Sequence, residues 1–240
     1  MDGSSLPVSD ADVSRLPRPR LFPPAWQADR DGLLCAGGNL QPELLLDAYR
    51  HGIFPWPSDD QSPLMWWSPD PRAVIELDRF HASRRLTRTI RSGQFSVSCD
   101  RDFGGVIRAC AGEHTRQGGT WITRKMIAAY ERLHNLGHSH SIEVRQDDRL
   151  VGGVYGISLG GLFAAESMFH RVTDASKVAL VHLVGHLRAR GYTLLDIQQW
   201  TPHTGRFGAS EIPRSQYLMR VAEAVELPVT FGDRLEGVPT

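Results

Sequence analysis

Apolar residues recur at helical spacing in several stretches of the chain. The clearest stretch is 123–136, where Ile127, Tyr130, Leu133 and Leu136 share one face and a glycine follows. The same periodicity, together with start and stop signals, predicts helices over residues 41–49, 83–92, 103–111, 174–190 and 213–225.

Shorter apolar or alternating runs predict strands over residues 73–77, 94–99, 141–146, 150–158, 161–169 and 193–200. Strands that meander and then cross over through a helix predict a mixed α/β (α+β) sheet. Upstream, residues 52–72 combine several prolines with three tryptophans. Such a composition predicts a rigid aromatic loop region rather than regular elements.

These patterns divide the chain into four parts. Residues 1–20 are rich in Ser, Asp, Pro and Arg, so we expect a flexible leader. A small N-terminal domain is expected over 21–70 and a larger mixed-sheet domain over 71–228, followed by a C-terminal tail over 229–240.

Composition narrows the class of protein. The 240 residues are 41% hydrophobic and carry no formal net charge, which excludes a fibrous or wholly disordered chain. No run approaches about 18 apolar residues and the N-terminus lacks an apolar signal region, so no membrane segment or secretion signal is expected. Cys35, Cys99 and Cys110 are widely spaced, which fits a reducing cytoplasm. Any RNA contact must come from local patches.

Polar residues interrupt two predicted strands. In 193–200, Asp196 and Gln198 lie two apart and so share a face, where a strand between helices should be apolar. They line a pocket at the strand end, or else form a hydrogen bond that ties the strand to a neighbouring loop. Glu166 lies within the apolar strand 161–169, either beside a ligand or paired with Arg171 or Lys177.

Two further groups suit RNA. Trp56, Trp66, Trp67, Trp121 and Phe163 exceed what a small core needs, and aromatic faces in loops suit nucleobase stacking. Core packing is the alternative for each of them.

Arginines also recur on one predicted helix. Arg84, Arg88 and Arg91 form a stripe over 83–92 that no acidic residue interrupts, which favours a phosphate contact over a simply solvated face.

No metal or cofactor site is expected. His134, His138 and His140 span a predicted helix end without a carboxylate or thiol to complete a zinc site. The glycines at 152–156 lack the G-K-[ST] of a phosphate loop and also the turn with which N-acetyltransferases bind acetyl-CoA.

Eight ordered motifs carry a resemblance over residues 22–225. They lie at 52–56, 66–72, 119–123, 137–144, 150–156, 166–169, 175–177 and 211–214. Together they resemble the leucyl/phenylalanyl-tRNA–protein transferases, bacterial aminoacyltransferases of the N-end rule pathway. The resemblance implies a small N-terminal domain and a GNAT-like domain that uses aminoacyl-tRNA in place of acetyl-CoA.

The resemblance also implies roles for residues. Asp196 and Gln198 would lie near the reacting amine, with Glu166 beside the aminoacyl group; Gln198 is preferred to Gln199 because it shares a face with Asp196. The implied substrate-binding residues are Trp56, Trp121 and Phe163 at the terminal adenosine, Tyr130 nearby, and Val154, Ser167, Met168, Leu180 and Leu183 around the amino-acid side chain. With aminoacyl-tRNA as the donor, the phosphate contact that the charge pattern predicts for Arg84, Arg88 and Arg91 becomes a contact with tRNA.

The implied reaction moves Leu or Phe, and Met less well, from tRNA to an N-terminal Arg or Lys of a protein. We expect a cytoplasmic monomer without a cofactor. Two alternatives are an acyltransferase that uses acyl-CoA, against which the missing pyrophosphate turn argues, and an RNA-binding module without catalysis, which would not need the inward polar residues.

Overall fold

The computed structural model describes residues 10–116 and 120–237. The helices are α1 (Asp10–Val13), α2 (Pro42–Arg50), α3 (Arg84–Arg91), α4 (Phe103–Arg116), α5 (Arg124–Asn135), α6 (Ala175–Arg190), α7 (Pro202–Gly205) and α8 (Arg214–Ala224), with 3-10 turns η1 (Ala25–Gln27) and η2 (Leu77–Arg79). The strands are β1 (Leu33–Ala36), β2 (Phe54–Pro55), β3 (Met65–Trp67), β4 (Arg72–Ile75), β5 (Ser96–Cys99), β6 (Ser139–Gln146), β7 (Arg149–Leu159), β8 (Leu162–His170), β9 (Leu194–Gln198) and β10 (Ala209–Ile212).

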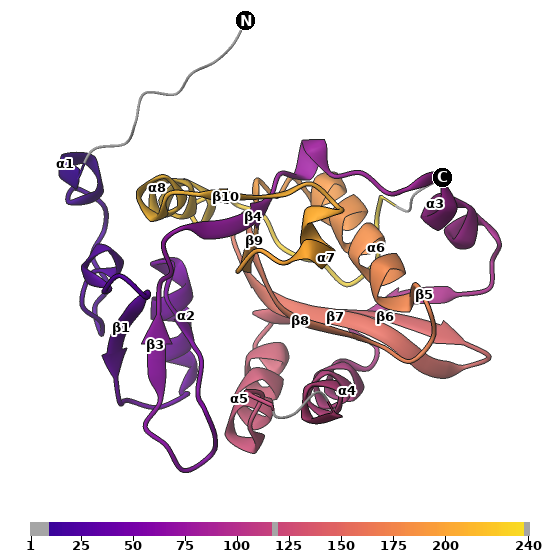
Figure 1. Cartoon of the computed structure of the whole chain (residues 1–240), viewed down its shortest axis with the longest axis horizontal. Coiled ribbons are helices and arrows are strands. Elements are labelled where there is room, and N and C mark those ends of the chain that lie inside the picture. Colours follow the sequence, from indigo (N-terminus) through magenta and orange to yellow (C-terminus); the bar gives the residue numbers. More distant parts are fainter. Residues whose placement is uncertain (1–9, 117–119, 238–240) are drawn as a thin grey trace, which may run out of the picture.

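A seven-stranded sheet forms the centre of the larger part, in the order β10-β4-β9-β8-β7-β6-β5. Its neighbouring strands are antiparallel except β8 and β9, which are parallel because α6 connects them as a crossover. Helices α4 and α5 cover one face of the sheet and α6 the other (Figure 1). This arrangement confirms the predicted mixed α/β class.

Local sequence explains the helix ends. Thr123 precedes α5, and its hydroxyl accepts a hydrogen bond from the backbone N–H of Met126 at 3.2 Å. Gly191 ends α6 with a φ of +84°, a conformation that glycine adopts without strain. The predicted helices are confirmed with modest shifts of their ends, except that α4 runs to Arg116, beyond the predicted end at residue 111.

The N-terminal part contains a second, three-stranded sheet in the order β1-β3-β2. The prediction that residues 52–72 hold no regular element is therefore wrong. Phe54 pairs with Trp67 across β2 and β3, and Pro55 is accommodated because β2 is an edge strand. Strand β10, which pairs with β4, was also not predicted.

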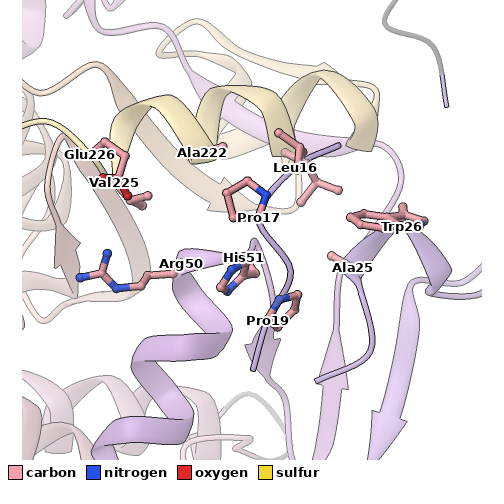
Figure 2. Close-up of a pocket in the computed structure, with 11 residues that line it drawn as sticks. Leu16, Pro17, Pro19, Ala25, Trp26, Arg50, His51, Ala222, Val225 and Glu226 are labelled. Carbon is pink, nitrogen blue, oxygen red and sulfur yellow. The ribbon is translucent and has the colours of Figure 1, made fainter. Parts of the chain in front are cut away.

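The segment before residue 21 packs against the rest of the chain. Val13 is only 2% exposed, α1 contacts α8, and the backbone N–H groups of Arg20 and Leu21 donate to Asp47. Figure 2 shows Leu16 and Pro17 beside α8, where they line a small apolar pocket with Trp26. The predicted flexible leader is therefore wrong for this segment, while residues 1–9 lie outside the described part.

The tail that follows residue 228 packs as well. Phe231 is 1% exposed, and its carbonyl lies 2.8 Å from the imidazole of His186 on α6.

Three further findings bear on the class of protein. No helix in the described ranges has the length and apolar character needed to span a bilayer. Across the same residues, no group of three or more His, Cys, Asp or Glu side chains is arranged to hold a metal ion. Cys35, Cys99 and Cys110 are all free thiols.

Candidate active site

The site lies where β8 and β9 part from each other. The two strands pair over three positions only, ending with Ala164 opposite Asp196, whereas β8 continues to His170. Just past this point each strand has a bulge. Glu166 is the extra residue of β8 against β7, and Ile197 is the extra residue of β9 against β4. A bulge bends its strand and redirects side chains, so both strands turn polar groups into the gap.

A pocket of about 260 Å³ opens at this point. Its walls come from Phe54, Pro55, Trp56, Trp121, Glu166, Ile197, Gln198, Gln199 and Thr201. Trp56 and Trp121 meet edge to face, with ring centroids 6.2 Å apart. Four of the residues predicted from sequence therefore share one cavity, in which two indoles face a carboxyl and an amide.

Glu166 is the carboxyl of this pocket. It accepts hydrogen bonds from the hydroxyl of Tyr130 at 3.2 Å and from the side-chain amide of Gln198 at 3.1 Å. Burial, aided by the negative charge of Asp196, raises the pKa of Glu166 to about 8, against the effect of the tyrosine hydrogen bonds. This acid can therefore hold or release a proton near neutral pH.

The alternative partners proposed for Glu166 are wrong. Arg171 donates to the backbone carbonyl of Leu150, and Lys177 pairs with Asp174 at 2.7 Å.

Asp196 lies behind the pocket rather than in its wall, and it is fully buried. Arg72 donates from Nε to Oδ1 at 2.8 Å and from Nη2 to Oδ2 at 2.6 Å, and the hydroxyl of Tyr217 donates to Oδ2 at 2.8 Å. Asp196 therefore does not line the pocket wall as expected, and these bonds tie the end of β9 to neighbouring elements. Its role near the reacting amine stays a prediction.

Asp196 reaches the pocket through Gln198. The backbone N–H of Gln198 donates to Asp196 Oδ1 at 2.9 Å, and Gln198 has a φ of +57°. A left-handed glutamine is unfavourable unless its surroundings hold it. The amide of Gln198 therefore meets Glu166 because of a bulge and a left-handed turn, not because of the strand alternation that favoured it over Gln199.

Sequence reasoning missed Arg72, Tyr217 and Tyr49. The guanidinium of Arg72 lies 4.7 Å from the ring centre of Phe54 and 4.4 Å from that of Tyr217. Tyr49, on α2, makes a short hydrogen bond to the hydroxyl of Tyr130. The only available signal was an arginine at the start of an apolar strand, and its partner Asp196 is 124 positions away.

Two family models cover this architecture. One, for leucyl/phenylalanyl-tRNA protein transferase, matches residues 74–222, and one for the N-terminal domain of the same proteins matches residues 38–70. The chain belongs to the leucyl/phenylalanyl-tRNA protein transferase family. It is therefore an aminoacyltransferase.

Full-length relatives agree with the family models. The transferase is 52% identical to the leucyl/phenylalanyl-tRNA–protein transferase of Anaeromyxobacter sp. strain K over 222 residues, which cover 92% of this chain and 94% of the relative. It is 50% identical to the enzyme of the same name from Pseudomonas putida over 209 residues, or 86% and 92% of the two chains.

Solved structures give a more distant likeness. FemX shares 12% identity and covers 72% of this chain and 67% of its own, with a TM-score of 0.46. A ribosomal-protein-alanine N-acetyltransferase from Brucella melitensis shares 18% identity over 47% of this chain and 85% of its own, with a TM-score of 0.35.

The other predicted substrate-binding residues of the transferase lie elsewhere. Phe163 is 1% exposed in the core beneath α6, where its ring centroid is 5.6 Å from that of Phe231, so the structure does not place it beside the two indoles. Val154, Leu180 and Leu183 are buried in the same core, and the half-buried Met168 packs against it opposite Val154. Their role around the donor side chain stays a prediction, as does that of the half-buried Ser167.

The basic stripe lies on α3, as predicted. Ser83 caps this helix by accepting from the backbone N–H of Leu86, and Arg84, Arg88 and Arg91 are all exposed. The neighbouring Arg85 joins α3 to the start of α6 through Asp174 at 2.9 Å. The predicted tRNA contact of this stripe remains to be tested.

Proposed function

We propose that this chain transfers leucine or phenylalanine, and methionine less well, from aminoacyl-tRNA to an N-terminal arginine or lysine of acceptor proteins. The observation that carries the proposal is the pocket in which Trp56 and Trp121 face Glu166 and Gln198. The names of the relatives supply the donor and the class of acceptor.

The two indoles suit the adenosine at the 3′ end of the donor. Both are half-buried, so their faces are supported and still reachable. Stacking on an aromatic side chain contributes about 1–3 kcal/mol per base. The hydroxyl of Tyr130 donates a hydrogen bond to Glu166 and helps to orient its carboxyl group.

The chemistry needs positioning and one proton carrier. The amine of the acceptor attacks the ester carbonyl, the new C–N bond forms, and the bond from the carbonyl carbon to the ribose oxygen breaks. The amine loses one proton and the ribose oxygen gains one, so no other reactant is required. Because the ester is already activated, holding the two groups together supplies much of the acceleration.

Glu166 is suited to carry that proton. An α-amine has a pKa near 8, and the pKa of Glu166 is raised to about 8 as well. Matched pKa values favour transfer in both directions. Gln198 would orient the carboxyl and the amine, and Asp196 would hold Gln198.

The same proposal includes a pocket for the donor side chain built from Val154, Met168, Leu180 and Leu183, next to Ser167. An unbranched thioether adapts to both leucine and phenylalanine. We further propose an N-terminal domain over 21–70 and a catalytic domain over 71–228, acting as a cytoplasmic monomer that marks proteins for the N-end rule pathway. The three free thiols fit that compartment.

A transfer assay tests the proposal. Labelled Leu, Phe or Val on tRNA is offered with peptides that begin with Arg, Lys or Ala, with and without RNase, and labelled acyl-CoA serves as the alternative donor. The proposal expects transfer of Leu and Phe to the Arg and Lys peptides only, and its loss after RNase treatment. Transfer from acyl-CoA, or equal transfer to the Ala peptide, would contradict it.

A further inference from the structure

Trp200 is the exposed aromatic residue next to the pocket. It is 44% exposed, whereas its neighbours Gln199 and Thr201 both line the cavity. An indole with this much exposed surface, directly beside the proposed nucleotide site, is a candidate contact for another group of the ligand.

The indole of Trp200 is held in place. Thr201 begins α7 and exchanges hydrogen bonds with Thr204 in both directions, which forms a capping box. One side of the ring lies against Gly205, where even a single added carbon would come within 2.7 Å of the ring. The ring is thus supported from beneath and presented rigidly at the rim.

Cationic side chains lie near His203, which is three residues past Trp200 on α7. Burial, and then the charges of Lys177, Arg206 and His170, lowers the pKa of His203 on α7. Lys177 and Arg85 both pair with Asp174, so two cations share one carboxylate and a net positive charge remains between α6 and the basic stripe of α3.

The positive charge near α7 indicates which of the two substrates, the RNA donor or the protein acceptor, contacts Trp200. A phosphate backbone is attracted by Lys177, Arg206 and the arginines of α3, whereas an acceptor that begins with Arg or Lys is repelled by them. Aromatic platforms within a basic groove are the usual means of holding single-stranded RNA.

We propose that Trp200 stacks on the nucleobase that precedes the terminal adenosine of the RNA donor. This site lies outside the pocket and rests on the proposed function, because it requires an RNA donor. The terminal adenosine would occupy the pocket at Trp56 and Trp121, and the next base would lie on the rim.

Two donors separate this role from a structural one. Phenylalanyl-tRNA carries the preceding nucleotides, and phenylalanyl-adenosine lacks them. In Trp200→Ala we expect kcat/KM for phenylalanyl-tRNA to fall about 5- to 150-fold through KM, the effect of losing one stacked base. The value for phenylalanyl-adenosine should stay within about twofold, and Trp200→Phe should keep most of the activity with tRNA. Leu136→Ala, which alters another exposed apolar side chain, is the control.

Other outcomes overturn the proposal. An unchanged KM for phenylalanyl-tRNA in Trp200→Ala excludes stacking on the donor. An equal loss with both donors assigns Trp200 to the architecture of the pocket, and a raised KM for the peptide alone assigns it to the acceptor. Failure of the wild-type protein to use either donor would instead contradict the proposed function.

Discussion

Arg72 and Asp196 form a two-pronged ion pair in which each side chain is 1% exposed. The pair links β4 to β9 directly behind the pocket. Asp196 uses the same Oδ1 to hold the backbone of Gln198, while Arg72 also donates to the carbonyl of Gly52 at 3.3 Å. One buried pair thus joins the N-terminal part to the wall of the site.

The first prediction concerns this pair. Arg72→Met leaves the carboxylate of Asp196 buried without its partner, so we expect the free energy of unfolding to fall by about 3–5 kcal/mol. Urea denaturation measures this change. Arg220→Met breaks the half-exposed pair with Glu76, whose atoms lie 2.6 Å apart, and should lower stability by less than about 1 kcal/mol. Equal effects of the two variants would contradict the assigned role.

The second prediction concerns Glu166 and pH. Its pKa is raised in the folded protein to about 8 from an ordinary value of 4.5, so the folded state binds a proton that the unfolded state has released. The free energy of unfolding should therefore fall as pH rises from about 4.5 to about 8. Glu166→Gln should remove this fall. The free energy of unfolding of the variant, relative to that of the wild type, should therefore be higher at pH 8.5 than at pH 5.5 by on the order of 1 kcal/mol or more.

Stability curves of both proteins at these two pH values test the point. Parallel curves for the wild type and Glu166→Gln would show that the carboxyl titrates normally. The same variant should also lose transfer activity by about 10²–10⁴-fold if Glu166 carries the proton.

The third prediction concerns the basic stripe of α3. Arg84→Ala combined with Arg88→Ala should weaken tRNA binding and reduce the slope of log affinity against log salt by about 1–2. Arg149→Ala removes an exposed arginine at the start of β7 and should leave the slope unchanged. If the double variant keeps the wild-type slope, α3 does not contact phosphate.

The fourth prediction concerns selection of the donor side chain. Met168→Ala should change the ratio of kcat/KM for Phe and Leu by about 10-fold or more, because the substitution enlarges the proposed cavity. Ile157→Val trims a side chain in the core on the opposite face of the sheet and should lower stability by about 0.5–1.5 kcal/mol without altering that ratio. An unchanged ratio in Met168→Ala would place the donor side chain elsewhere.

Much of the fold follows from local pattern. The helices α5 and α6 and the meander β6 to β8 could be predicted, because their periodicity and their caps at Thr123 and Gly191 are local signals. The short strands β2 and β3 could not be predicted. Their prolines and tryptophans are typical of a loop, and the pairing of Phe54 with Trp67 depends on the tertiary fold.

The residue types of the site could be predicted from the sequence, but its hydrogen bonds and ion pairs could not. Glu166 and Gln198 stand out as polar residues in apolar strands, and they do line the pocket. The partner of Asp196 is a distant arginine, and the bulges at Glu166 and Ile197 break the alternation from which faces are assigned. Long-range pairing and bulges have no local signature in a single sequence.

A crystal structure with a non-hydrolysable leucyl-adenosine, in which an amide replaces the ester, tests the central claim most directly. The account predicts that the adenine lies against Trp56 and Trp121, with the leucyl amine within hydrogen-bond distance of Glu166. Binding of the ligand at another place, or an aminoacyl group directed away from Glu166 and Gln198, would contradict it.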